Sequence, residues 1–248
     1  MTPAYPTRDL EGKVALVVGG SRGQGAACAE LLAMRGAAVT ISYAHGEEAA
    51  ARTLSTLDGY GVTAEAVRSD ATRSADVNTL FEGVVVRHGR IDIVVHAVGT
   101  VLRKALTQHT DEDFDLLIDL NTRSVFNTLR ASARHLADHG RYVVVTSALA
   151  SAMPGRYGLY AAAKAAVERL VPVAAQELAV REITVNAVAP GPVTGSCRSG
   201  ANPAEPRTRS PRGRAGQPED IAQVVGWLAG DTADWVSGQT IRADGGLL

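Results

Sequence analysis

The stretch VALVVGGSRGQG, residues 14–25, decides the fold. Its first five residues are apolar and have the length of a buried strand, and its glycine-rich turn leads into an alanine-rich segment that ends at Arg35-Gly36. A strand, a glycine turn and a helix in this order open a dinucleotide-binding unit, because glycines let the backbone approach a pyrophosphate whose charge the helix N-terminus favours. A glycine turn by itself could equally be an ordinary tight turn, so the rest of the chain has to support this interpretation.

The rest of the chain alternates between strand-length apolar runs and helical patterns. Strands are expected at Lys13–Val18, Ala38–Tyr43, Ala64–Arg68, Ile91–Val98, Arg141–Thr146, Ile183–Val188 and Thr240–Ala243. Helices are expected at Gly23–Arg35, Glu47–Leu57, Ser74–Arg87, Asp111–Ala137, Tyr157–Ala179 and Pro218–Gly230. Such alternation predicts a parallel sheet that is covered by helices on both faces. We therefore predict a single α/β domain over residues 1–248, a doubly wound Rossmann fold with seven parallel strands.

Composition agrees with a single α/β domain of ordinary size. The 248 residues are 46% hydrophobic, which is enough to bury a full core, and the net charge of −1 gives no reason to expect a nucleic acid or an anionic membrane as partner. The two cysteines, Cys28 and Cys197, have no metal-ligand spacing, so neither a metal site nor a disulfide framework is expected. No apolar run reaches membrane-spanning length, and residues 1–12 lack the apolar core of a secretory signal, so we expect a cytoplasmic protein.

Three residues that could perform acid–base chemistry stand in the second half of the chain. Tyr160 and Lys164 are four residues apart, which places them on one face of the helix expected there. A phenol titrates near about 10, and a neighbouring ammonium lowers its pKa. Ser147 ends an apolar run, where the crevice of an open α/β sheet binds ligands, so its hydroxyl could hold a substrate oxygen. A tyrosine packed on a helix beside a solvated lysine is the plain alternative for the pair.

Together with the glycine turn, these residues make the chain resemble the short-chain dehydrogenase/reductase family over nearly its whole length. The turn is similar to the family's T-G-x-x-x-G-x-G with Val18 in the threonine position, and Ser147 and Tyr160-x-x-x-Lys164 stand at the family spacing. Asn121 matches the fourth catalytic position of the family. Further matches are Ser69-Asp70-Ala71, Pro190-Gly191, Gly216–Ala222 and Ser237–Gly246.

The resemblance implies an enzyme that transfers hydride between NADP(H) and a carbonyl compound. Tyr160 would exchange the proton, Ser147 would steady the substrate oxygen, Lys164 would act on the phenol and the nicotinamide ribose, and Asn121 would anchor a water beside Lys164. Without the family, Ser147 could instead cap a turn, and Asn121 could be an amide satisfied at a helix bend. The implied cofactor-binding residues are Gly19, Ser21, Arg22, Gly23, Gln24, Gly25, Tyr43, His45, Asp70, Ala71, Ala97, Val98, Gly99, Tyr160, Lys164, Pro190, Gly191, Val193 and Thr194.

Charge predicts NADP(H) rather than NAD(H) as the cofactor. NAD-dependent relatives carry an acid after the second strand, which would repel the 2′-phosphate of NADP, and here that position holds Tyr43. Arg22 supplies a fixed positive charge with a donor fork suited to phosphate, and Ser42 and His45 could add donors. The alternative is that Arg22 is a solvated surface residue and that the site accepts either nucleotide.

Three segments depart from the family pattern. The usual N-N-A-G after the fourth strand reads His96-Ala97-Val98-Gly99, where we expect His96 to be a structural histidine with satisfied hydrogen bonds. The usual threonine five residues after Pro190 is Gly195, for which Thr194 or Ser196 could substitute. Residues 195–217 have no large apolar side chain and many arginines, so we expect a flexible substrate loop there.

The resemblance extends to bacterial 3-oxoacyl-carrier-protein reductases and polyhydroxynaphthalene reductases. It implies a small ketone or alcohol as substrate, free or bound to a carrier protein, and a homotetramer in which the helices at 111–137 and 157–179 form one interface. The arginine-rich loop could meet an acidic carrier or could be merely solvated. A protein of this fold that binds NADP without turnover is the alternative function, and the complete set of four catalytic positions argues against it.

Overall fold

The computed structural model describes residues 8–152, 155–195 and 210–248. Its strands are β1 (Val14–Val18), β2 (Ala38–Tyr43), β3 (Ala64–Arg68), β4 (Ile93–His96), β5 (Arg141–Val145), β6 (Thr184–Pro190) and β7 (Thr240–Ala243). Its α-helices are α1 (Gly23–Met34), α2 (Glu47–Asp58), α3 (Ser74–His88), α4 (Asp111–Ile118), α5 (Ser124–His135), α6 (Leu149–Ala152), α7 (Gly158–Leu178) and α8 (Pro218–Leu228). Short 3-10 turns lie at Leu106–Gln108, Ala179–Arg181 and Asp231–Ala233.

The strands form one seven-stranded parallel sheet in the order β3-β2-β1-β4-β5-β6-β7. The chain runs outward from β1 to β3, returns to the middle at β4 and then runs outward to β7. The carboxyl ends of β1 and β4 therefore flank the point where the winding reverses, which is where open α/β sheets bind their ligands. This arrangement confirms the predicted fold class.

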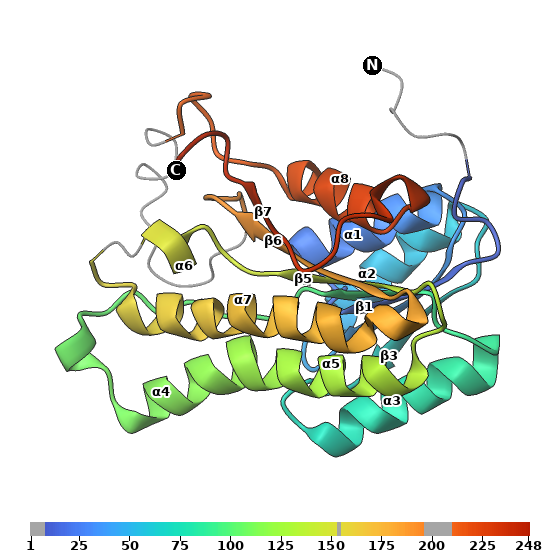
Figure 1. The fold of residues 1–248 in the computed structure, drawn as a ribbon, viewed down its shortest axis with the longest axis horizontal. Coiled ribbons are helices and arrows are strands. Elements are labelled where there is room, and N and C mark those ends of the chain that lie inside the picture. The colour runs from blue at the N-terminus through green and yellow to red at the C-terminus, as the bar shows by residue number, and fades with distance from the viewer. Residues whose placement is uncertain (1–7, 153–154, 196–209) are drawn as a thin grey trace.

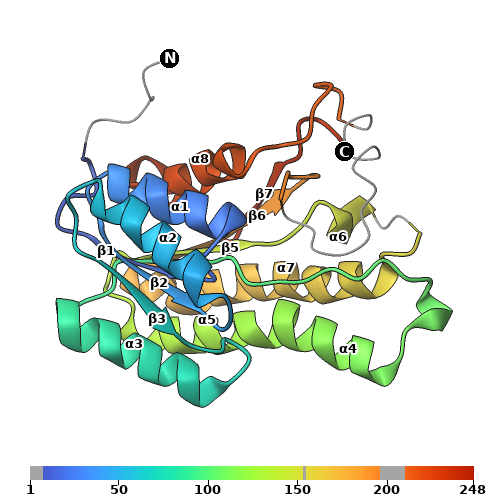
Figure 2. The same ribbon diagram turned by 180° about the vertical axis from the view of Figure 1, so that it is seen from behind.

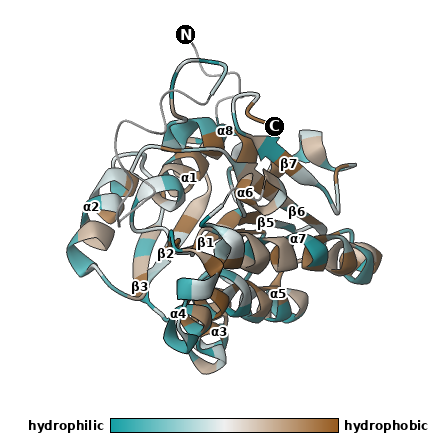
Figure 3. Cartoon of the chain, turned by 90° about the vertical axis from the view of Figure 1, so that its left-hand side faces the viewer, coloured by the Kyte–Doolittle hydropathy of each residue, from teal (hydrophilic) through white to brown (hydrophobic). Residues whose placement is uncertain are grey.

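Helices cover both faces of the sheet. Figures 1 and 2 show α1, α2 and α8 on one face and α3, α4, α5 and α7 on the other. Each face has its own apolar core: Leu32, Ile41 and Ile221 belong to the first, and Phe81 and Tyr142 belong to the second. Apolar residues concentrate on the strands and on the helix faces that meet them (Figure 3). No helix among the described residues is long and apolar enough to cross a membrane.

One buried cation ties the start of the chain to its last helix. Arg35 follows α1 and is 2% exposed. Its Nε donates to Asp9 Oδ1 at 2.8 Å, and its Nη2 donates to Asp9 Oδ2 at 2.5 Å. Its Nη1 donates to the Gly226 carbonyl in α8. The guanidinium thus closes one edge of the first core, where α1 packs on α8.

The element predictions were wrong in three places. The helix expected at Asp111–Ala137 is interrupted by a π turn, Asp119–Arg123, and it ends at His135. The interruption is caused by one extra residue in the turn, so that Ser124 N donates to Asp119 O, five residues back. The strand expected at Ile91–Val98 is shorter, and the four-residue helix α6 was not predicted.

The substrate loop predicted at about 195–217 lies largely outside the described residues, because the structure describes only Gly195 and Ser210–Gln217 of it. The described end is anchored. Gly216 N donates to Pro192 O at 2.8 Å, and Thr194 N donates to Gly216 O at 2.9 Å. Arg214 also forms a two-pronged ion pair with Asp220 in α8.

Candidate active site

The glycine turn between β1 and α1 is closed tightly on itself. A Cβ atom on Gly25 would lie 2.1 Å from the Gly19 carbonyl oxygen, so only glycine fits there. Gly19 has a φ of +83°, which glycine adopts without strain, and its N–H donates to the Ser42 carbonyl at 3.1 Å. A Cβ on Gly23 would meet nothing within 4 Å, so the start of α1 opens into space. A helix N-terminus with this open approach fits a pyrophosphate.

The residues predicted to read the adenine ribose lie at the ends of β1 and β2. Arg22 is the N-cap of α1 and is exposed, and Ser21 is buried, with its carbonyl accepting from Thr53 Oγ1 at 3.0 Å. Tyr43 ends β2 and is half-buried, and His45 is exposed beyond it. The glycine turn therefore carries one exposed cation, Arg22, and position 43 at the end of β2 holds a tyrosine rather than a carboxylate.

The segment after β3 forms a compact turn around Asp70. Its Oδ1 accepts from Thr72 N at 2.9 Å and from Thr72 Oγ1 at 2.7 Å. The carbonyl of Ala71 accepts from Asn127 Nδ2 at 3.1 Å. These bonds hold the backbone of Asp70 and Ala71, two of the predicted cofactor-binding residues, at the carboxyl end of β3.

Lys164 and Asn121 converge beside Gly99. Lys164 lies in α7 and is 3% exposed, and its Nζ donates to the Val145 carbonyl at the end of β5 at 3.0 Å. Burial lowers the pKa of Lys164 to about 8, and the charge of Glu168 opposes this shift. A Cβ on Gly99 would lie 2.8 Å from Asn121 Oδ1 and 3.0 Å from Lys164 Nζ. A side chain at position 99 would therefore collide with both groups.

The side chain of Asn121 is held by backbone groups of two segments. Its Nδ2 donates to Thr100 O and to Leu117 O, both at 2.9 Å, and its Oδ1 accepts from Thr100 N at 3.2 Å. Asn121 lies in the π turn and is completely buried. Asn121 is therefore an amide satisfied by backbone at a helix bend, which is the alternative that the sequence left open. It also lies near Lys164, since both groups are close to Gly99.

In the sequence, Ser147 precedes the short helix α6 and Tyr160 follows it. Ser147 follows β5 and is buried, and its Oγ accepts from Leu149 N at 3.2 Å. That bond uses a lone pair and leaves the hydroxyl proton available to another acceptor. Tyr160 lies in the first turn of α7, half-buried, one turn before Lys164. The roles assigned to these two residues from sequence stay predictions.

The end of β6 supplies the last predicted cofactor contacts. A Cβ on Gly191 would lie 2.9 Å from Asp244 Cα, so the Pro190-Gly191 turn packs directly on the C-terminal segment. Val193 forms a bridge to Gly216, and Thr194 Oγ1 donates to Gln217 Oε1 at 2.8 Å. Thr194 is therefore engaged with the start of α8, and Ser196, the other proposed substitute, lies outside the described residues.

The sequence profile of the family described as enoyl-(acyl carrier protein) reductase matches residues 18–248. The chain belongs to the short-chain dehydrogenase/reductase family. A probable tetrahydroxynaphthalene reductase of Zymoseptoria tritici is 36% identical and aligns with 99% of this chain and 98% of its own. A Burkholderia cenocepacia short chain dehydrogenase in complex with NADP is 35% identical, with a TM-score of 0.91 over 96% of this chain and 99% of its own. The angucycline C-6 ketoreductase LanV with bound NADP is 33% identical, with a TM-score of 0.92 over 98% of each chain.

In this short-chain dehydrogenase/reductase, His96 is a structural histidine, as expected. It is completely buried at the end of β4, with Ser124 and Thr128 as hydrogen-bond partners. Burial, and to a lesser degree the charge of Lys164, lower the pKa of His96 to about 3, so the imidazole is neutral. Sequence reasoning missed Ser124 and Thr128. Their spacing of four residues, which puts two hydroxyls on one face of a helix, was the available signal.

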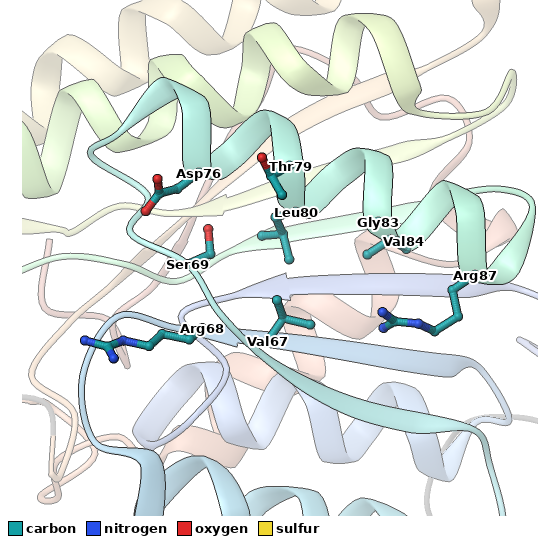
Figure 4. Close-up of a pocket in the computed structure, with 9 residues that line it drawn as sticks. All are labelled: Val67, Arg68, Ser69, Asp76, Thr79, Leu80, Gly83, Val84 and Arg87. Carbon is teal, nitrogen blue, oxygen red and sulfur yellow. The ribbon is translucent and has the colours of Figure 1, made fainter.

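A separate groove lies away from these residues. It holds about 400 Å³ between the edge strand β3 and α3, over the apolar side chains of Val67, Leu80 and Val84 (Figure 4). Two charged residues of its rim have partners, because Asp76 accepts from Asp70 N at 3.3 Å and Arg87 pairs with Glu65. None of the predicted catalytic or cofactor-binding residues of this short-chain dehydrogenase/reductase lines the groove.

Proposed function

We propose that the protein is an NADPH-dependent reductase that converts a ketone into a secondary alcohol. The observation that carries this proposal is the buried Lys164, held at the end of β5 beside Asn121 and Gly99 and one helical turn from Tyr160. A buried ammonium is costly, so its position one helical turn from Tyr160 supports a catalytic role. Membership in an oxidoreductase family supports the same reaction class.

The residues present fit NADP(H). The collapsed turn at Gly19 and Gly25, with open space in front of Gly23, fits a pyrophosphate at the start of α1. Arg22 stands exposed at that helix start, where it would meet a 2′-phosphate, and no acid occupies position 43. Two relatives of similar fold were solved with NADP, which supports the same choice here. NADPH, when bound, supplies the hydride that reduces the carbonyl carbon.

The protein's own residues would then handle the carbonyl oxygen. Ser147 uses its available proton to donate a hydrogen bond to that oxygen, which orients the ketone. Tyr160 donates its phenolic proton to the oxygen as the alcohol forms. Lys164 stabilises the resulting phenolate by its positive charge, and Asn121 holds the turn beside Lys164. Proton transfer of this kind is general acid catalysis.

The substrate class we propose is a 3-oxoacyl, polyketide or aromatic ketone, either free or attached to a carrier protein. Support comes from relatives whose names describe a tetrahydroxynaphthalene reductase and an angucycline ketoreductase. A homotetramer is proposed as the assembly, in line with exposed apolar side chains on α4, α5 and α7.

A panel of aryl, polyketide-like and 3-oxoacyl ketones, each assayed with NADPH and with NADH, tests the proposal. We expect loss of the reduced-nicotinamide absorbance with at least one ketone, faster with NADPH. Tight binding of NADPH without turnover of any ketone or alcohol would instead indicate a nucleotide-binding sensor of the same fold.

A further inference from the structure

A chain of hydrogen-bonding side chains crosses the second core behind the active site. His96 Nε2 lies 3.1 Å from Ser124 Oγ, and His96 Nδ1 lies 3.0 Å from Thr128 Oγ1. Thr128 Oγ1 lies 2.8 Å from the hydroxyl of Tyr142 in β5. At the other end, Ser124 Oγ donates to the carbonyl of Leu120 at 2.8 Å. The four side chains are completely buried, so each polar atom needs a partner inside the protein.

The direction of the protons along this chain follows from its end. A carbonyl oxygen can only accept, so the single proton of Ser124 goes to Leu120. Ser124 Oγ then accepts from His96 Nε2, whereas the reverse assignment would use the longer contacts of Thr128 Oγ1 with the carbonyls of Val125 at 3.0 Å and Ser124 at 3.2 Å. In the assignment that uses the shorter Ser124–Leu120 bond, Nδ1 accepts from Thr128 and Tyr142 donates to Thr128. This assignment gives every atom of the chain a partner of the opposite role.

The chain ends at the turn that carries Asn121. Leu120 precedes Asn121 in the π turn, whose extra residue leaves it without the regular helical bonding pattern. Asn121 in turn bonds to Thr100, in the segment that follows β4. The π turn is thus hydrogen-bonded to the β4 region at two places. His96 at the end of β4 contacts Ser124 inside the core, and Thr100 in the following segment bonds to Asn121.

We propose that His96 is a positioning residue, which acts through Ser124 to fix the π turn and so holds Asn121 against Lys164 and Gly99. The proposal rests on the proposed function, since Asn121 matters for turnover only if the protein reduces a carbonyl. If the hydrogen bonds of His96 merely satisfied a buried ring, loss of its Ser124 partner and loss of its Thr128 partner would have the same effect on turnover. If His96 positions the turn, only the Ser124 side affects the active site.

Two single variants separate these cases. Ser124→Ala removes the link to Leu120, and Thr128→Val removes the opposite link from His96 to Tyr142. We expect both to lower the unfolding temperature, but only Ser124→Ala to lower kcat, by about ten- to hundredfold, because small displacements in a catalytic site carry costs of this size. KM should change little. Amide hydrogen exchange in residues 117–125 should quicken in Ser124→Ala and not in Thr128→Val.

Replacing His96 itself gives a second comparison. The amide of His96→Gln can place a donor near the Nε2 position, so it should recover most of the kcat that His96→Leu loses. Equal kcat for Ser124→Ala and Thr128→Val, or unchanged exchange in the π turn of Ser124→Ala, would overturn the proposal. The exchange measurement needs no substrate, so it decides the role of His96 even if the wild-type protein reduces no ketone.

Discussion

The hydroxyl of Tyr160, rather than its ring, is the group proposed to transfer the proton. Tyr160→Phe keeps the ring in the first turn of α7 and removes only the exchangeable proton. We expect kcat to fall by roughly two to four orders of magnitude, the usual weight of general acid catalysis. The dissociation constant for NADPH, measured by fluorescence titration, should stay close to wild type. Near-wild-type turnover would end the proposed mechanism.

The guanidinium of Arg22 is proposed to meet the 2′-phosphate, which only NADPH carries. Arg22→Ala should therefore weaken NADPH and leave NADH almost unchanged. A charge-assisted contact is worth about 1.5–3 kcal/mol, or roughly ten- to hundredfold in affinity. Titration of the variant with both nucleotides provides its own control, and equal losses for the two would show that Arg22 does not read the phosphate.

Burial of Lys164 should cost the protein stability. Its pKa is lowered from 10.5 to about 8, so the folded state releases a proton that the unfolded chain keeps between these pH values. The free energy of unfolding attributable to this group therefore rises as pH increases through that window. Lys164→Met should be more stable than wild type at pH 7 by about 1–3 kcal/mol, less the lost hydrogen bond to Val145. Urea unfolding of both proteins at pH 7 and at pH 10 measures this difference in the free energy of unfolding, which should be smaller at pH 10. A difference independent of pH would contradict the lowered pKa of Lys164.

The roles of some single residues could be predicted from the sequence, and the contacts of others could not. Tyr160, Lys164 and the glycine turn could be named because their spacing is local and their side chains do one kind of chemistry. Ser124 and Thr128 could not be assigned to a network, because polar residues on a helix look solvated until the position of β4 is known. The contact of Thr194 with Gln217 likewise joins residues separated by 23 positions.

Among the elements, two glycines on different helices should respond oppositely to the same change. Gly25→Ala places a Cβ 2.1 Å from the Gly19 carbonyl, so the turn must open and NADPH binding should be lost. Gly83→Ala lies in the interior of α3, where a Cβ meets nothing within 4 Å. It should raise the free energy of unfolding by about 0.5–1 kcal/mol. Thermal unfolding with and without NADPH measures both; a stable Gly25→Ala that still binds NADPH would contradict the account of the turn.

Most elements could be predicted because their apolar periods are local, but the break between α4 and α5 could not. Residues 111–137 have no proline or glycine to mark a break. The π turn is stabilised by tertiary bonds from Asn121 to Thr100 and from Ser124 to His96, and a sequence pattern does not contain them. The helices at Asp111 and Pro218, in contrast, begin where predicted, because Thr110 caps the first and a proline occupies the first position of the second.

For the whole molecule, the helical face of α4, α5 and α7 is the surface proposed to join subunits. Phe114, Phe126 and Val173 on these helices are 50%, 47% and 51% exposed, and exposed apolar side chains are used in subunit interfaces. Phe126→Glu should reduce the particle from a tetramer to a smaller species in sedimentation equilibrium. Val86→Glu on α3, where Val86 is 86% exposed, is the matched control and should leave the mass unchanged. A monomeric wild type would contradict the assembly.

The doubly wound parallel sheet could be predicted at this scale because strands and helices alternate along the chain. The pairing of α1 with α8 could not, since it depends on contacts between the two ends of the chain.

The buried Arg35 also bears on the order in which the protein is made. Its partner Asp9 leaves the ribosome before it, but the Gly226 carbonyl follows 191 residues later. At bacterial or eukaryotic rates of translation that interval lasts roughly 10–40 s. During it the nascent nucleotide-binding half carries a cation that has no complete burial site, and α1 has no α8 to cover it. We therefore expect the packing of the first half of the chain to be completed only after the last helix emerges.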